Sequence, residues 1–127
     1  MPLVRIELPE SIDAGTARNI GEAIHQAMME LINVPAGDKF QIITRHSAEG
    51  RNLTTEYLGI RYSENLVLIQ ITLNQGRTVE LKKAFYRRVA DDLAQLGLRK
   101  QDVVINLVEV AKENWSFGNG EMQYAPQ

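Results

Sequence analysis

The chain has 127 residues, of which 44% are hydrophobic and 24% are charged, so it is long enough for one globular domain with a single core. Its formal net charge of -2 lacks the positive excess of a nucleic-acid-binding domain, and the lack of cysteine excludes disulfides and thiolate chemistry. No segment resembles a signal peptide or a membrane span, since the longest apolar run, Leu66 to Leu73, has only the length of a strand. We therefore expect a cytoplasmic protein that binds neither nucleic acid nor membrane.

The first half of the chain predicts a strand, a helix and a second strand. The strand begins at Leu3, directly after Pro2. The helix starts from a cap at Ser11 or Asp13, because either side chain can accept hydrogen bonds from the first helical N–H groups. It ends near residue 33, and the second strand covers residues 40–44. The helix is amphipathic because its apolar residues recur at spacings of three and four: Ala17, Ile20, Ile24, Met28 and Leu31.

The second half repeats this order. Residues 66–73 form a nearly continuous apolar run, which is typical of a strand buried on both faces at the centre of a sheet. Thr78 caps the next helix, which ends at Gly97, a residue suited to the left-handed conformation that follows many helices. Residues 103–108 give the last strand.

An offset of 64 residues aligns the two halves, residues 2–44 and 66–110, and places Asp38 on Asp102. The pattern predicts an α+β fold in which two tandem β-α-β units form a mixed four-stranded sheet, with both helices on one face. The other face would remain bare and apolar, so we expect further subunits to cover it. We treat residues 1–127 as a single domain.

Two segments lie outside the repeat. Residues 45–65 connect the halves and are mostly polar, with a short strand or hairpin expected at 57–62. The tail, residues 111–127, places Trp115 and Phe117 among small residues. These aromatic side chains are expected to dock on another surface, where they either contact substrate or extend the core.

Pro2 is the first candidate catalytic residue. Met1 is normally removed when the next residue is as small as proline, which would leave Pro2 as a terminal secondary amine. An α-amino group has a pKa of about 7.7–8.0 and burial disfavours its cation, so such an amine can take up or release a proton near neutral pH. The alternative is that Pro2 only favours methionine removal or begins a strand.

Several features together carry a resemblance to a known family. They are Pro2, the paired β-α-β halves, and the segments VPAGDKFQ (34–41), GRTVELKK (76–83) and WSFG (115–118). With these features in this order and spacing, the chain resembles the tautomerase superfamily. Within it, the pattern is most similar to the malonate semialdehyde decarboxylase branch. The resemblance implies a homotrimer with an amino-terminal proline in each active site, near the subunit boundaries.

The resemblance also implies site residues. Pro2 and Asp38 match the catalytic proline and the acidic residue of the branch, and Arg77 matches the arginine that holds the substrate carboxylate. A guanidinium offers a planar fork of donors to a carboxylate, and its place before a helix N-terminus adds a favourable dipole. Two alternatives remain, since Arg77 could pair with Glu80 at the surface and Asp38 could be a turn residue like Asp102.

The chain departs from the branch at Gln75, where the decarboxylases carry a second arginine. Gln75 can still hydrogen-bond a carboxylate, but a charged hydrogen bond is about twice as strong as a neutral one. Substrate affinity or identity should therefore differ. Arg45 or Arg61 could supply the missing positive charge.

Two reactions on a small oxo-carboxylic acid fit these residues. A neutral Pro2 would remove a proton α to a carbonyl, which gives keto-enol tautomerisation with Arg77 on the carboxylate. A nearby Asp38 would instead favour protonated Pro2, which polarises a carbonyl for decarboxylation or hydration of a 3-oxo acid such as malonate semialdehyde. We favour tautomerisation, because Asp38 is present but the second arginine is not. A binding or signalling protein remains open, because retained Met1 would convert the Pro2 amine into an amide.

No cofactor or metal is expected. His25 and His46 are isolated, without acidic or cysteine partners at the spacing of metal ligands. No glycine-rich phosphate-binding loop occurs in the sequence.

Overall fold

The computed structural model describes residues 2–126, so whether Met1 is removed lies outside the described residues. Two β-α-β units make up most of it. The first comprises β1 (Leu3–Pro9), α1 (Ala14–Leu31) and β2 (Gln41–His46), and the second comprises β5 (Val67–Asn74), α2 (Val79–Gln95) and β6 (Val103–Val110). This confirms the strand-helix-strand order predicted for each half. The segment between the two units contains the 3₁₀ turn Ala48–Gly50 and the hairpin of β3 (Glu56–Tyr57) and β4 (Ile60–Arg61). Two more 3₁₀ turns, Lys100–Asp102 and Lys112–Asn114, come before and after β6.

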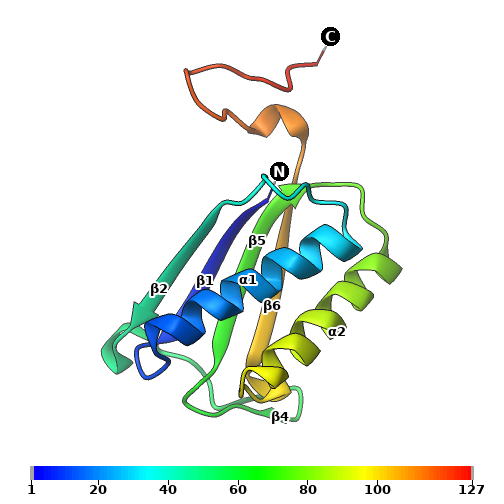
Figure 1. Ribbon diagram of the computed structural model, residues 1–127. Coiled ribbons are helices and arrows are strands. Elements are labelled where there is room, and N and C mark those ends of the chain that lie inside the picture. The colour runs from blue at the N-terminus through cyan, green and yellow to red at the C-terminus, as the bar shows by residue number, and fades with distance from the viewer. Residues whose placement is uncertain (1, 127) are drawn as a thin grey trace.

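The four long strands form the mixed sheet that was predicted, and their order in it is β2-β1-β5-β6. β1 is parallel to β2 and β5 is parallel to β6, whereas the central strands β1 and β5 are antiparallel, with Leu3 opposite Thr72. The two units therefore run in opposite directions across the sheet. We call the end of the sheet where β1 and β2 begin and β5 and β6 end the amino-terminal pole, and the other end the opposite pole (Figure 1).

Local signals explain where the helices begin and end. Asp13 rather than Ser11 caps α1, since its Oδ1 accepts a hydrogen bond of 2.7 Å from the Thr16 N–H. Thr78 caps α2 through a bond of 3.2 Å from the Leu81 N–H. After α2, Gly97 has a φ of 96°, which glycine adopts without steric cost. Within residues 2–126, neither helix is both long and apolar enough to cross a membrane.

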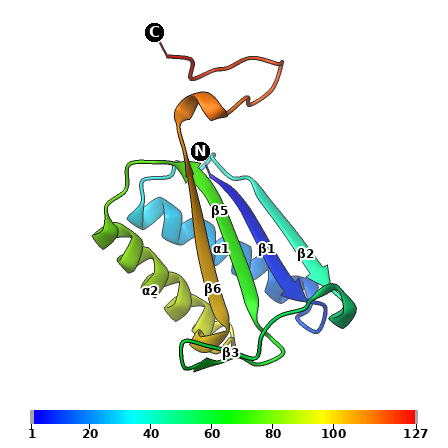
Figure 2. The same ribbon diagram turned by 180° about the vertical axis from the view of Figure 1, so that it is seen from behind.

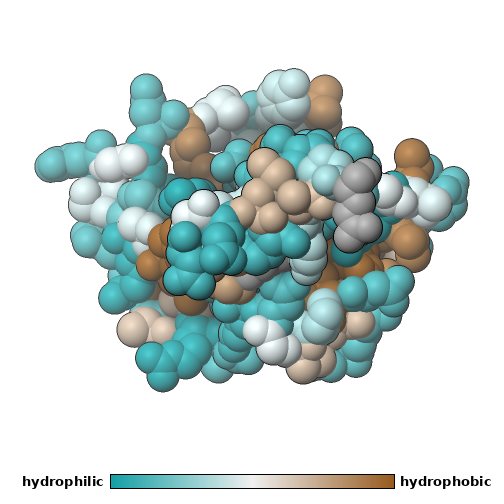
Figure 3. Space-filling view, turned by 90° about the horizontal axis from the view of Figure 1, so that it is seen from above, coloured by the Kyte–Doolittle hydropathy of each residue, from teal (hydrophilic) through white to brown (hydrophobic). Residues whose placement is uncertain are grey.

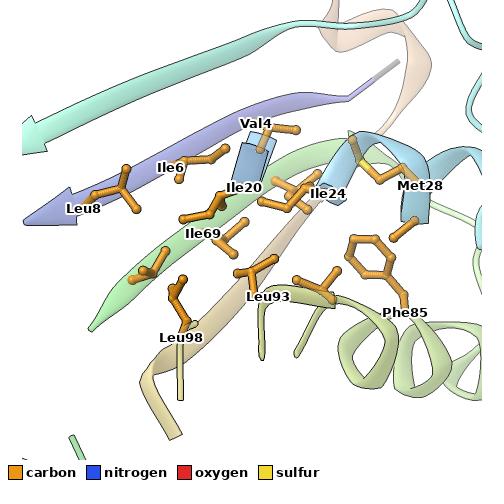
Figure 4. Close-up of a cluster of buried hydrophobic side chains, with 14 of the residues drawn as sticks. Val4, Ile6, Leu8, Ile20, Ile24, Met28, Ile69, Phe85, Leu93 and Leu98 are labelled. Carbon is orange, nitrogen blue, oxygen red and sulfur yellow. The ribbon is translucent and has the colours of Figure 1, made fainter. Parts of the chain in front are cut away.

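The core lies between the helices and one face of the sheet. Both helices cover the same face, while the other face is open in the rear view (Figures 1 and 2). Side chains from β1, α1, β5 and α2 interlock there, as the close-up shows (Figure 4). The largest fully buried ones include Ile6, Ile24, Ile69 and Phe85. Four of the five residues in the apolar stripe predicted for the first helix are buried, so periodicity identified the core face of α1.

The open face is not the continuous apolar surface that we expected. Buried residues alternate with more exposed ones along β5, so this central strand is fully buried on one face only. Gln70 and Asn106 are exposed on the open face, where the Gln70 amide donates a hydrogen bond of 3.0 Å to Asn106. Arg5 on β1 is also exposed. The expectation was wrong because it took the apolar run of one strand as representative of the whole face.

Candidate active site

Pro2 lies at the amino-terminal pole. It immediately precedes Leu3, whose partner on β5 is Thr72, so it lies beside the last residues of β5. On its other side, the Val4 N–H donates to the Phe40 carbonyl at 2.9 Å, which ties the start of β1 to the segment that enters β2. Pro2 is buried. The strand pairing therefore fixes the position of this residue on both sides.

Asp38 lies at the same pole, in the segment that connects α1 to β2. It is half-buried in a turn just before β2, with its N–H bonded to the Pro35 carbonyl at 3.0 Å. Its repeat counterpart, Asp102, lies at the opposite pole and is only 1% exposed. There it accepts hydrogen bonds from the Ser63 N–H at 2.8 Å and the Ser63 hydroxyl at 2.5 Å. The two acids thus have different surroundings, and only Asp38 shares a pole with Pro2.

Arg77 follows β5 and is held in place by backbone carbonyl groups. Its Nη1 donates to Asn74 at 2.9 Å and its Nη2 donates to Ile32 at 2.9 Å. Ile32 caps the C-terminus of α1, where a positive charge is favourable. No ion pair between Arg77 and Glu80 occurs among the described residues. A guanidinium has five N–H donors, so three remain for a ligand after these two bonds.

Gln75 and Asn74 lie between Arg77 and the end of β5. Gln75 is exposed, and its N–H extends the β5-β6 ladder by a bond of 3.0 Å to the Val110 carbonyl. Asn74 was not predicted as a site residue. Its carbonyl oxygen binds Arg77, while its side-chain oxygen accepts a hydrogen bond of 2.8 Å from the Trp115 indole. A polar residue at the end of an apolar strand was the signal for this role.

The tail packs on itself at the amino-terminal pole. Trp115 stacks on Phe117 with ring centroids 5.6 Å apart, and Tyr124 meets Phe117 edge-on at 5.4 Å. Figures 1 and 2 show this segment extending beyond the sheet, away from the helices. From above, this end of the molecule carries hydrophobic side chains in small groups among hydrophilic ones (Figure 3). Trp115 and Phe117 are half-buried and remain outside the core.

Neither arginine proposed to replace the missing one reaches this pole of its own chain. Arg45 donates to the carbonyls of Ile12 and Glu10, both at 2.8 Å, at the opposite pole. Arg61 lies on the β3-β4 hairpin, where it is 3.3 Å from Glu56. The sequence did not show at which pole these two arginines lie, because that depends on the direction in which each strand crosses the sheet.

Charge at the amino-terminal pole also depends on Glu109, near the end of β6. The Lys82 ammonium, 2.6 Å away, lowers the pKa of this carboxyl most, with smaller contributions from the Gly76 N–H and Arg77. Glu109 is therefore ionised at neutral pH. Its negative charge offsets part of the positive potential of Lys82 and Arg77.

A cavity of about 520 Å³ lies at the opposite pole and contains none of the predicted site residues. His46 in its wall bonds to Glu7 at 2.5 Å, and His25 bonds to the Ala36 carbonyl near the amino-terminal pole. The two histidines thus belong to different ends of the molecule. Within residues 2–126, no group of three or more His, Asp and Glu side chains is arranged to hold a metal ion. We assign the candidate site to the pole of Pro2, because the proposed chemistry requires an amine.

Comparison with known proteins identifies relatives of this arrangement. Residues 38–118, more than half of the chain, match the protein family described as tautomerase enzymes. The chain is 40% identical over 124 residues to the probable tautomerase YusQ of Bacillus subtilis (strain 168), covering 97% of this chain and 98% of that protein.

Solved structures with the same fold include two malonate semialdehyde decarboxylases. The FG41 enzyme, inhibited by 3-bromopropiolate, is 35% identical with a TM-score of 0.89, over 96% of this chain and 93% of that one. The second, described with decarboxylase and hydratase activities, is 29% identical with a TM-score of 0.86, over 95% and 94% of the chains. A fused 4-OT described as a symmetric trimer shares the fold at 22% identity and a TM-score of 0.76, over 94% of each chain.

The anchoring role of the Trp115 indole can be tested with Trp115→Phe, which keeps an aromatic ring on Phe117 and removes the bond to Asn74. A neutral hydrogen bond contributes about 1 kcal/mol, equivalent to roughly a fivefold change in an opening equilibrium. Amide hydrogen exchange in residues 112–126 should accelerate by about that factor, whereas exchange in α1 should not change. Tyr124→Phe, which keeps the edge contact, is the control. Equal exchange in both variants would contradict the anchoring role.

Proposed function

Because the chain belongs to the tautomerase family, we propose that it is an enzyme that uses the Pro2 nitrogen to move protons on small oxo-carboxylic acids without a cofactor, most simply by keto-enol tautomerisation. The observation that supports this proposal is the gathering of Pro2, Asp38 and Arg77 at one pole of the sheet. An amine, a carboxylate and a guanidinium from separate parts of the chain supply the groups needed for proton transfer and carboxylate binding.

Tautomerisation needs Pro2 in its neutral form. Burial of the residue disfavours the cation, and a terminal α-amino group starts from a pKa of about 7.7–8.0. The nitrogen then takes the proton from the carbon next to the carbonyl, electrons move towards the oxygen, and the returned proton completes the enol. Arg77 holds the substrate carboxylate with its remaining N–H donors. The aromatic rings of Trp115 and Phe117 form the outer wall of the site.

Decarboxylation of a 3-oxo acid is the second candidate, supported by the likeness to the two decarboxylases. In this reaction, protonated Pro2 donates a hydrogen bond to the carbonyl oxygen. The bond to the carboxylate breaks with release of carbon dioxide, its electron pair forms an enolate whose oxygen accepts the hydrogen bond from Pro2, and protonation at carbon gives the aldehyde or ketone. A negative Asp38 favours this protonated form. Hydration uses the same polarised carbonyl, with water as the nucleophile.

The role of the Pro2 nitrogen can be tested by changing its chemistry, since Pro2→Ala replaces the secondary amine with a primary amine and retained Met1 converts the nitrogen into an amide. Pro2→Ala, or a form with Met1 verifiably retained, should reduce kcat/KM for phenylpyruvate tautomerisation by about 10²–10⁴-fold, the usual contribution of a positioned acid or base. Pro9→Ala, at the far end of the same strand, is the matched control and should leave turnover unchanged. Full activity with Met1 present in the intact mass would remove Pro2 from the mechanism, whereas absence of turnover in protein without Met1 would favour a binding function.

The substrate carboxylate can be located with Arg77 and Gln75. Arg77→Ala should weaken kcat/KM by about 1.5–3 kcal/mol, the range for a hydrogen bond to a charged group, while Arg61→Ala should have no effect. Gln75→Arg should raise malonate semialdehyde decarboxylation relative to phenylpyruvate tautomerisation, because it adds a second cation. Unfolding curves must accompany these assays, since Arg77 also binds two backbone carbonyls. A silent Arg77→Ala would show that the carboxylate is held elsewhere.

We also propose a homotrimer, in line with the symmetric trimer formed by the structural relative. Exposed apolar residues lie on the β2 edge, the β3-β4 hairpin and the tail, including Ile42, Leu58 and Tyr124. Their burial between subunits would remove this surface from water. Sedimentation equilibrium at micromolar concentration should give three times the mass of the chain, whereas a monomer would contradict the assembly.

A further inference from the structure

The turn that carries Asp38 is fastened to α1 by a buried histidine. The chain leaves α1 and crosses the top of the sheet to reach β2 (Figure 1). His25 on α1 is only 6% exposed, and its Nε2 lies 3.0 Å from the Ala36 carbonyl oxygen. A carbonyl can only accept a hydrogen bond, so Nε2 carries the hydrogen. Ala36 is two residues before Asp38, which makes this contact one of the nearest restraints on the carboxylate.

The other ring nitrogen of His25 shows that this contact is not simple core packing. Nδ1 is buried and has no hydrogen-bond partner within residues 2–126. A buried polar atom without a partner is unfavourable, so an aliphatic side chain would pack better here. The neighbouring core residues of α1, Ile24 and Met28, are apolar. The buried imidazole therefore lowers stability through its Nδ1, while its Nε2 forms the bond to Ala36.

A second contact from the same helix holds the other side of the turn. Glu22, three residues before His25, forms an ion pair with Lys39, the residue that follows Asp38. The hydrogen bond from Lys39 lowers the pKa of Glu22 more than any other contact, so the pair is charged at neutral pH. Both side chains are largely exposed, which makes the ion pair the weaker restraint. His25 and Glu22 thus fasten the turn at the residues that flank Asp38.

We propose that His25 is a positioning residue of the candidate active site, since its hydrogen bond to Ala36 fixes Asp38 relative to Pro2. The inference rests on the proposed roles of Pro2 and Asp38. The influence of a carboxylate on a nearby amine falls with distance, so displacement of the turn would weaken the effect of Asp38 on the Pro2 proton. Gly37 makes the bond from His25 more important for holding the turn. Nothing lies within 4 Å of the position that a Cβ would occupy at Gly37, so side-chain packing does not hold the turn at that residue.

The test uses His25→Leu, which removes the donor, and His25→Gln, whose amide nitrogen can replace Nε2. The readout is the ¹⁵N titration of Pro2 in protein without Met1. We expect His25→Leu to raise the acid dissociation constant of the Pro2 cation about threefold, in the same direction as Asp38→Asn, because both changes weaken a negative neighbour. His25→Gln should restore it to within about twofold. Gln26→Ala, an exposed neighbour on α1, is the control.

A double-mutant cycle shows whether His25 acts through Asp38. In an Asp38→Asn background, His25→Leu should produce no further shift of the Pro2 titration, because coupled residues are not additive. An equal shift in both backgrounds would overturn the proposal, and so would a failure of His25→Gln to restore the titration. A His25→Leu variant that lowers the melting temperature without shifting the Pro2 titration would also overturn it. In His25→Leu, decarboxylation of malonate semialdehyde, which uses protonated Pro2, should fall by up to about threefold in kcat, whereas phenylpyruvate tautomerisation, which uses neutral Pro2, should not fall. Loss of the proposed function would instead appear as full activity of Pro2→Ala.

Discussion

The antiparallel pairing of β1 with β5 determines where everything else in the molecule lies. Each β-α-β unit has parallel strands, and only this central ladder makes the two units run in opposite directions. As a result, the start of the chain meets the end of β5, and the turn before β2 reaches the same pole. A reversed pairing would place Pro2 and Arg77 at opposite ends of the sheet.

Elements with strong local signals were predictable from the sequence. Thr78 and Gly97 bound the second helix because capping and left-handed conformations depend on a few adjacent residues. The buried face of α1 followed from periodicity. The open face did not, because exposure there depends on neighbouring strands: Gln70 and Asn106 come together only through the parallel register of β5 and β6.

The residues proposed for the candidate site came from the sequence, whereas the contacts that hold them came only from the structure. Pro2, Asp38 and Arg77 came from a resemblance in pattern, and their common pole follows from the topology. The contacts that hold them were not visible in the sequence, since they go largely to backbone carbonyl groups at Asn74, Ile32 and Ala36. A carbonyl is present at every residue, so no residue type marks it as a partner. Arg45 and Arg61 lie away from this pole in their own chain, and the sequence did not show this because only the fold distinguishes one pole from the other.

The attachment of the tail has a consequence for how substrate preference can change. Its side-chain hydrogen bond to the sheet runs from Trp115 to Asn74, and its aromatic rings contact one another outside the core. We therefore expect exchanges in this segment to leave the helices and strands intact. The surface that the tail presents could then change while the strands and the turn that carry Pro2, Asp38 and Arg77 stay the same. The same separation makes it a natural place for directed evolution to begin.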